Sequence, residues 1–295
     1  MPRQQHRIRN MADMPQTRWR TQPLRRHAAL ASLAIAALIF ATATTALAET
    51  VAFEVPYKGR TIKIEGELKK PPGREGPFPV VIGLHTCTGP GDYSTNFWMV
   101  TLAAQGYATY QPDSFGPRGY VEICDFTSLV TAAERAQDAL VAAATLAARP
   151  DIRGDKIAIL GVSHGGGVAI RLSREVEARA PLNQKLADAG GKIVAAVSLY
   201  GGCTPDLKHP AILPLLILVG SDDDWTPPKP CQEFANEGSN PKLVQIHVYP
   251  GATHSFDNAS IFTRQMAHGH RMAYDAEATS DARARVIEFL RLLMQ

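Results

Sequence analysis

The sequence predicts an α/β protein with a mostly parallel, doubly wound sheet and helices on both faces. Apolar runs of strand length recur along residues 80–249, and amphipathic stretches with helical spacing lie between them. Turns rich in glycine and aspartate follow several of these runs. Because ligands bind beyond the carboxyl ends of the strands in such sheets, we expect the functional residues in these turns.

The expected elements follow the chain in order. A pair of edge strands is predicted at residues 51–67. The six central strands are predicted at residues 80–85, 108–111, 156–161, 194–200, 215–220 and 244–249. Helices are predicted at residues 131–148, 165–176 and 275–294. Residues 49–295 are therefore expected to form a single domain.

A serine follows the strand expected at residues 156–161, within the segment Gly161-Val162-Ser163-His164-Gly165. In a G-x-S-x-G motif the serine lies on a sharp turn between a strand and a helix, and the glycines relieve the crowding. A serine that only caps the helix is the structural alternative. We interpret Ser163 as a nucleophile.

A nucleophilic serine needs a histidine that takes its proton and a carboxylate that orients the histidine. Asp222, Asp223 and Asp224 follow the strand expected at residues 215–220, and His254 follows the last expected strand. His254 is preferred among the nine histidines because it lies in a turn after both other members. The order Ser, Asp, His is one that hydrolases with this motif use.

Five segments together form a longer pattern. They are Leu84-His85-Thr86-Cys87-Thr88-Gly89, Asp113-Ser114-Phe115-Gly116-Pro117-Arg118-Gly119, the motif at Ser163, Asp223-Asp224-Trp225-Thr226-Pro227 and Tyr249-Pro250-Gly251-Ala252-Thr253-His254-Ser255-Phe256. The pattern resembles the α/β-hydrolase superfamily and, more closely, its dienelactone hydrolase-like family. The resemblance implies an α/β-hydrolase fold. Dienelactone hydrolases proper carry cysteine where this chain has Ser163, which favours ordinary ester chemistry.

The resemblance also selects the orienting acid. The family pattern Gly-x-x-Asp, counted from Gly220, ends at Asp223. Asp222 and Asp224 remain alternatives, since a solvated turn also accounts for acidic residues here.

Two backbone amides are expected to stabilise the oxyanion of the tetrahedral intermediate. One is the amide of His164, which directly follows the nucleophile. The resemblance places the other at Cys87, with Thr86 as the alternative.

These residues predict a serine hydrolase that cleaves small carboxylic esters or lactones through an acyl-enzyme intermediate. Its partner is a small-molecule substrate, and the mechanism requires no cofactor. A peptidase or acyltransferase with the same triad, or a catalytically inactive binding module, is the alternative. No metal site is expected because the sequence contains neither C-x-x-C nor H-E-x-x-H. The sequence does not predict an oligomeric state.

Residues 1–48 have the pattern of a secretory signal peptide that is removed. Arginines precede an apolar stretch at residues 28–40, and Ala46-Leu47-Ala48 offers a small-residue cleavage site before Glu49. The apolar stretch is too short for a membrane-spanning helix, so no permanent membrane anchor is expected. The mature protein is therefore expected to be periplasmic or secreted.

The positive charge of the chain lies mostly in this leader. Residues 1–48 contain seven arginines and one aspartate, so the remaining residues carry a net formal charge of −3, against +3 for the whole chain. No basic stripe or zinc-finger spacing occurs in the sequence. A nucleic-acid partner is therefore not expected.

Four cysteines in an exported chain predict two disulfide bonds. The positions of the loops favour pairing Cys87 with Cys124 and Cys203 with Cys231. The first bond would tie the loop that carries an oxyanion donor to a neighbouring loop. Four buried thiols are the alternative.

Two further side chains have two interpretations each. Arg118 either pairs with a substrate carboxylate or anchors its own loop by bonding backbone carbonyls. Trp225 either lines the substrate pocket or covers the core. Residues 120–129, 178–191 and 258–272 are candidate pocket walls.

Overall fold

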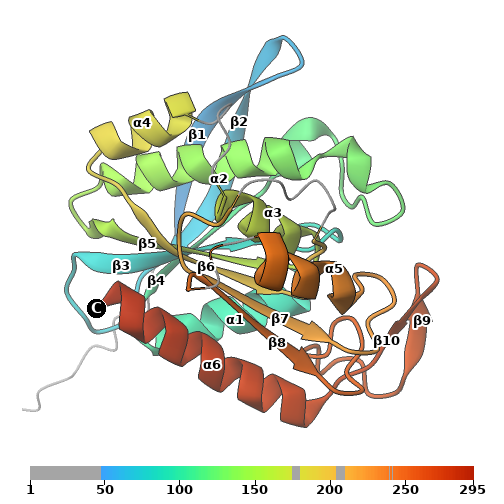
Figure 1. Cartoon of the computed structure of the whole chain (residues 1–295). Helices are drawn as coiled ribbons and strands as arrows, with labels where there is room; N and C mark the ends of the chain where they lie inside the picture. Colours follow the sequence, from blue (N-terminus) through green and yellow to red (C-terminus); the bar gives the residue numbers. More distant parts are fainter. Residues whose placement is uncertain (1–47, 175–179, 204–209, 239, 241) are drawn as a thin grey trace, which may run out of the picture. The chain divides into compact units, whose positions relative to one another are not determined.

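The computed structural model describes residues 48–174, 180–203, 210–238, 240 and 242–295. Apart from residue 48, the predicted signal peptide lies outside the described residues. Eight strands form one sheet in the order β1-β2-β4-β3-β5-β6-β7-β8 (Figure 1). The pairs β1–β2 and β2–β4 are antiparallel, and all the other pairs are parallel. The predicted mostly parallel sheet with a pair of strands at its edge is confirmed.

The sheet strands are β1 (Glu49–Tyr57), β2 (Arg60–Lys69), β3 (Phe78–Leu84), β4 (Ala108–Pro112), β5 (Ile152–Val162), β6 (Ile193–Leu199), β7 (Leu215–Gly220) and β8 (Val244–Tyr249). The helices are α1 (Tyr93–Ala104), α2 (Ala132–Ala147), α3 (His164–Leu172), α4 (Ala180–Asp188), α5 (Pro228–Glu233) and α6 (Ala276–Met294). A separate hairpin consists of β9 (Gln265–Ala267) and β10 (His270–Met272). Short helical turns are η1 (Gly116–Arg118), η2 (Thr127–Leu129) and η4 (Phe234–Gly238).

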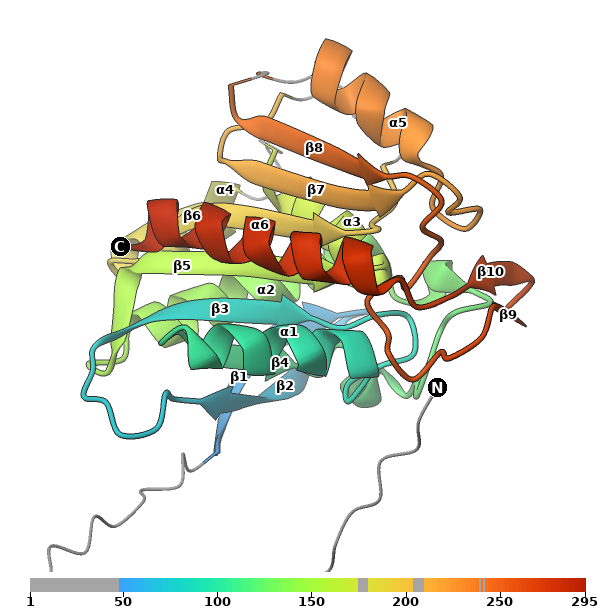
Figure 2. The ribbon, with the colours of Figure 1, turned by 90° about the horizontal axis from the view of Figure 1, so that it is seen from below.

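Helices cover both faces of the sheet, with α1 and α6 on one face and α2, α3 and α4 on the other (Figure 2). Alternate side chains of β5 pack into the cores on opposite faces of the sheet. Ile157 and Ile159 pack into the core beneath α2 and α3, whereas Ala158 and Leu160 pack into the core beneath α1 and α6. Because both faces of β5 are buried from Ile157 to Val162, its sequence is continuously apolar there rather than alternating.

Capping residues fix the ends of the predicted helices. Thr131 and Glu134 form a capping box that starts α2, and the Asp275 side chain caps α6. Both helices match their predicted ranges to within a residue at each end. The third prediction is too long, since α3 ends at Leu172 and the Ser173 hydroxyl donates to the Ile170 carbonyl.

Two segments predicted only as candidate pocket walls contain regular structure. Residues 178–191 include α4, which buries Leu186 in the core beneath α2. Residues 258–272 include the β9–β10 hairpin, and Met272 forms a β-bridge with His254. Within the described part of the chain, no helix has the length and apolar character needed to cross a lipid bilayer.

Candidate active site

Ser163 occupies the tight turn between β5 and α3. Its φ of 53° and ψ of −115° lie in a region that side-chain-bearing residues rarely adopt. The turn is possible because Gly161 and Gly165 are small: a Cβ at Gly161 would overlap the carbonyl group of Gly165. The strained turn holds the Ser163 side chain at the end of the sheet, beside His254.

The three predicted triad residues are connected by hydrogen bonds. Ser163 Oγ lies 2.9 Å from Nε2 of His254, and Nδ1 of His254 lies 2.9 Å from Oδ2 of Asp223. His254 and Asp223 are only 1% and 3% exposed, so water does not compete for the bond between them. The arrangement gives the Ser163 hydroxyl a base and gives the base a fixed orientation.

Backbone amides hold the acid in place. Asp223 Oδ1 accepts from the amides of Trp225 and Thr226, and the Thr226 hydroxyl lies 2.8 Å from Asp223 Oδ2. The two alternative acids point elsewhere. Asp224 accepts from the backbone and side chain of Arg271, and Asp222 accepts from a neighbouring serine hydroxyl. Of the three aspartates, Asp223 is the one bonded to His254.

Tyr200 links His254 to a second buried carboxylate, that of Asp257. The ring of Tyr200 packs edge-on against His254, and its hydroxyl donates to Asp257 over 2.6 Å. Asp257 also accepts from Ser94 Oγ and from Nε1 of Trp98. Burial raises the pKa of Asp257, and its three donors oppose that shift. Asp257 was assigned no role from the sequence, although it directly follows the segment that carries His254.

The two predicted oxyanion donors are the backbone amides of Cys87 and His164. Among the described residues, none accepts a hydrogen bond from the amide of Cys87 or His164. The amide of Thr86, the alternative donor, instead lies 3.3 Å from the Asp92 carboxylate. The geometry therefore favours Cys87 over Thr86.

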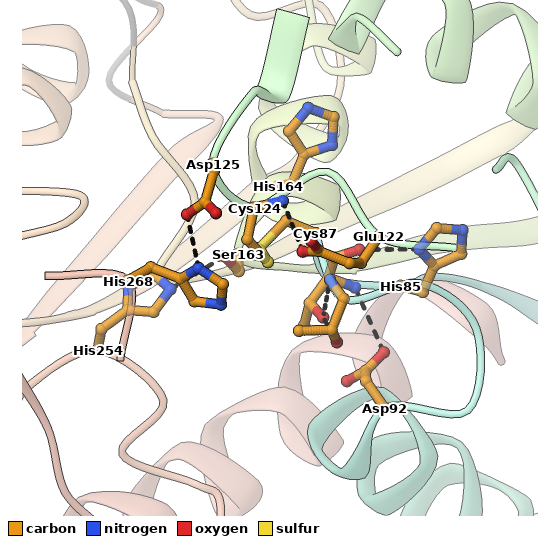
Figure 3. The surroundings of a disulfide bond; sticks show 12 residues. His85, Cys87, Asp92, Glu122, Cys124, Asp125, Ser163, His164, His254 and His268 are labelled. Atoms are coloured by element: carbon orange, nitrogen blue, oxygen red, sulfur yellow. Dashed lines mark hydrogen bonds and ion pairs between the residues drawn. A yellow bond between two sulfur atoms is a disulfide. The ribbon is translucent and has the colours of Figure 1, made fainter. Parts of the chain in front are cut away.

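Both predicted disulfide bonds are present. Cys87 bonds Cys124, and the amide of Ile123 donates to the Cys87 carbonyl over 2.8 Å (Figure 3). The second bond joins Cys203 to Cys231. The first disulfide therefore ties the backbone at Cys87, the predicted oxyanion donor, to the loop that carries Cys124.

Arg135 connects the two segments that carry the predicted oxyanion donors. Its fully buried guanidinium lies 2.7 Å from Nδ1 of His164 and 2.8 Å from the His85 carbonyl. Burial lowers the pKa of Arg135 to about 10, and burial together with Arg135 lowers the pKa of His164 to about 3. A guanidinium only donates, so His164 is neutral and accepts at Nδ1. In Figure 3 the His164 ring points away from His254.

Sequence reasoning did not find Arg135. The available signal was its place on α2, since Arg135 and Asp138 occupy positions that the apolar spacing of the helix assigns to the core. Charged residues at such positions have internal partners or a function. Asp138 accepts two hydrogen bonds from Arg118, which also donates to the Ser114 carbonyl. Arg118 thus anchors its own loop, which was the alternative to pairing with a substrate carboxylate.

Two cavities border Ser163. One has a volume of about 420 Å³ and reaches Thr127 and Ser128, and the other has a volume of about 190 Å³ and reaches Asn258 and the β9–β10 hairpin. Trp225 borders both and packs against His254 with a ring-centroid distance of 4.9 Å. Trp225 therefore lines the candidate substrate site, together with parts of the expected walls at residues 120–129 and 258–272.

One group of side chains near the site has the composition of a metal site. Glu122, Cys124 and His268 each place a ligand-type atom within 4.8 Å of the others. The sulfur of Cys124 is in a disulfide, and His268 is 2.7 Å from Asp125. The group therefore lacks the free thiolate that a metal ion would bind.

Comparisons with solved structures agree with this architecture. A dienelactone hydrolase-like promiscuous phosphotriesterase from metagenomic libraries has 23% identity and a TM-score of 0.63, over 83% of this chain and 99% of that one. A dienelactone hydrolase from Anabaena variabilis has 20% identity and a TM-score of 0.59, over 84% and 99%. An esterase from Thermogutta terrifontis has 13% identity and a TM-score of 0.58, over 82% and 90%. At these identities the likeness shows the fold.

A family model provides the assignment by sequence. No curated protein matches the sequence of this chain. The model described as the dienelactone hydrolase family matches residues 64–294, which include β3, all the later strands and the candidate triad. The chain belongs to the dienelactone hydrolase family.

Proposed function

We propose that the protein is a serine hydrolase that cleaves small carboxylic esters, including lactones, through an acyl-enzyme intermediate. The observation that carries the proposal is the continuous chain of hydrogen bonds from Ser163 Oγ through His254 to Asp223. Ser163 is the nucleophile, His254 the general base and acid, and Asp223 the orienting carboxylate. The amides of Cys87 and His164 are the oxyanion donors.

Acylation begins when Ser163 Oγ attacks the ester carbonyl carbon. The Ser163 proton passes to Nε2 of His254, and the carbonyl oxygen becomes an oxyanion that accepts from the two amides. Asp223 stays ionised and stabilises the imidazolium that forms. The bond to the leaving oxygen then breaks, and His254 donates its proton to that oxygen, so the alcohol departs and an acyl-serine ester remains.

Deacylation repeats these steps with water. His254 takes a proton from a water molecule that attacks the acyl carbon, and the oxyanion is held by the same amides. The bond between the acyl group and Ser163 Oγ breaks, and the serine recovers its proton from His254. The products are a carboxylic acid and the free enzyme, so every proton is accounted for by groups of the chain and by water.

The proposal extends to where the protein acts. Residues 49–295 form the single catalytic domain, and residues 1–48 are a signal peptide that directs export to the periplasm or outside the cell. Two disulfide bonds support this location, because such bonds persist mainly in oxidising compartments. Cells that export the protein should release a shorter mature chain, and sequencing of its N-terminus should find Glu49 as the first residue.

Hydrolysis of methyl butyrate, followed by acid release, tests the function. Wild-type protein should hydrolyse the ester and should react with a fluorophosphonate at Ser163. The Ser163→Ala variant should lose about 10,000-fold or more in kcat, because triad members act as a unit. Its thermal unfolding provides the control for folding. Wild-type hydrolysis by Ser163→Ala would contradict the proposal.

The alternative reactions are tested with the same material. Butyramide in place of the ester measures amide cleavage, and added alcohols measure transfer of the acyl group. An esterase should prefer the ester and water. Faster cleavage of the amide would favour a peptidase, and a dominant transfer product would favour an acyltransferase.

A further inference from the structure

The two cavities meet at Ser163 but are built from different parts of the chain. The larger one is bordered by residues of η2, the start of α2 and the start of α3. The smaller one is bordered by the start of α1 and by the β9–β10 hairpin. Cys87, Ser163 and Trp225 border both cavities. A substrate carbonyl at Ser163 therefore has two separate spaces for its two substituents.

Proton transfer determines which substituent enters which space. The leaving oxygen receives its proton from Nε2 of His254, so the alcohol must lie on the side of this ring. Of the two cavities, as the described residues define them, only the smaller one is bordered by His254. The larger one is bordered instead by His164, the proposed oxyanion donor. The acyl substituent is thereby directed toward the larger cavity.

We propose that the larger cavity binds the acyl group of the substrate and the smaller cavity binds the alcohol. This inference rests on the proposed function. It assigns a substrate class, namely esters of an uncharged acyl group of several carbons with a small, polar alcohol.

The chemistry of the larger cavity supports an uncharged acyl group. Its described lining contains no lysine, arginine, aspartate or glutamate. Ala132 and Gly167 provide small surfaces there, and Thr127 and Ser128 provide uncharged ones. The nearby Arg135 is fully buried behind His164, with its terminal nitrogens bonded inside the protein. A carboxylate on the acyl group would therefore lose water without gaining a direct ionic partner among these residues.

The chemistry of the smaller cavity supports a polar alcohol. Thr88, Asp92 and Asn258 border it, and their side chains carry hydroxyl, carboxylate and amide groups. Its volume of about 190 Å³ is less than half of the 420 Å³ on the other side. A short alcohol with hydrogen-bonding groups fits this space better than a long alkyl chain does.

Two tryptophan substitutions test the assignment by filling one cavity each. Ala132→Trp places a large side chain at the larger cavity, and Ala267→Trp does so at the smaller one. Each has a matched control on the same element. Ala133→Trp changes an exposed residue of α2, and Met266→Trp changes a residue of β9 that is 63% exposed. Neither control residue borders a cavity.

Two isomeric esters provide the readout. Methyl hexanoate has a long acyl group and a short alcohol, whereas pentyl acetate has the reverse. Wild-type kcat/KM should be about tenfold higher for methyl hexanoate, because added methylenes need a space that accommodates them. Ala132→Trp should lower kcat/KM at least about tenfold more for methyl hexanoate than for pentyl acetate. Ala267→Trp should show the opposite bias, and both controls should keep the wild-type ratio.

Some outcomes would overturn the inference while leaving the proposed function intact. The opposite bias in each variant would show that the assignment is reversed, and equal losses on both esters in both variants would contradict separate subsites. Loss of all hydrolysis in the Ser163→Ala variant but not in wild type still supports the serine mechanism in those cases. If wild-type protein hydrolyses neither ester, both the proposed function and this inference are contradicted.

A second variant covers the case in which Ala132→Trp does not fold. Ser128 borders the larger cavity and is exposed, so Ser128→Trp fills the same space with less effect on packing. It should reproduce the bias against methyl hexanoate. Thermal unfolding of each variant confirms that the compared proteins are folded.

Monomethyl glutarate and methyl butyrate test whether the acyl subsite prefers an uncharged group. Wild-type kcat/KM should be at least about tenfold lower for the anionic ester. Equal values would contradict an uncharged acyl subsite.

Discussion

The two sides of Ser163 are held in place by different means. On the His254 side, side chains bond side chains, from Ser163 through His254 to Asp223. On the oxyanion side, the groups proposed to bind the substrate oxyanion are the backbone amides of Cys87 and His164. Two groups bond the segments that carry these amides: Arg135, which bonds the His164 ring and the His85 carbonyl, and Cys124, which forms the disulfide with Cys87.

This difference determines what a mutation can show. A side chain on the His254 side is removed by one substitution, and the loss reports its chemical role directly. A backbone amide keeps its N–H group in every substitution except proline, so the oxyanion side is weakened only through its supports. We therefore expect large, specific losses on the first side and smaller losses on the second, where activity and stability change together.

The largest effect is expected for the acid on the His254 side. Asp223→Asn keeps the shape of the side chain but favours the wrong tautomer of His254, so kcat should fall about 10,000-fold. Asp224→Asn is the matched control, since Asp224 bonds Arg271 on the exposed side of the same turn. Its kcat should stay close to that of wild type. Similar losses in both variants would contradict the assignment of Asp223.

A smaller effect is expected at Arg135. Arg135→Met removes the bonds to His164 and His85, so kcat should fall about 100-fold while KM changes little. The affinity for a trifluoromethyl ketone, which forms an oxyanion on Ser163, should fall by a similar factor. The matched control is the double variant Arg118→Met with Asp138→Leu, which removes a neighbouring buried ion pair. If this control loses as much inhibitor affinity as Arg135→Met, the role of Arg135 is general packing.

The two disulfides allow a comparison at nearly equal stability. They join residues 37 and 28 positions apart, so loss of either should lower the free energy of unfolding by about 3–4 kcal/mol. Replacement of Cys87 and Cys124 by alanine should also lower kcat about tenfold, because one oxyanion donor loses its support. Replacement of Cys203 and Cys231 should leave kcat within about twofold of wild type. Equal kcat values in the two variants, measured where both are folded, would contradict this distinction.

The smallest effect is expected in the pH dependence of stability. His164 has a pKa of about 3 in the folded protein, below its ordinary value of 6.5. As the pH falls below 6.5, the unfolded chain therefore takes up a proton that the folded protein does not, and stability decreases toward pH 3. His164→Gln should reduce this slope by up to about 1.4 kcal/mol per pH unit between those values. Urea unfolding at pH 5 and pH 7 measures the change, and an unaltered slope would contradict it.

The sequence predicted the His254 side more completely than the oxyanion side. Ser163 and His254 were predicted as triad members because glycine spacing and strand order can be recognised in the sequence, and the structure places the two side chains in contact. The choice among Asp222, Asp223 and Asp224 rested on a family pattern, and the backbone bonds to Trp225 and Thr226 give the physical reason for it. Each of these residues lies in a turn that a short local pattern marks, so each could be predicted from the sequence.

Long-range contacts explain what was missed. Arg135 reaches His85 and His164 from another element, across 50 and 29 positions of sequence, so no local pattern marks the contact. Asp257 likewise depends on donors from α1 and from the end of β6. The short hairpin β9–β10 was predicted only as part of a loop, because three-residue strands have too few residues to show alternation. Tertiary contacts define these features.

Rapid-quench mass spectrometry during hydrolysis of methyl butyrate detects whether Ser163 carries the acyl group. We expect a butyryl group on the peptide that contains Ser163, formed before the bulk of the product and absent from the Ser163→Ala variant. In the His254→Ala variant the acyl-enzyme should form and decay far more slowly, since one residue serves both half-reactions. Hydrolysis at the wild-type rate with no acyl group on Ser163, or with the group on another residue, would contradict the account.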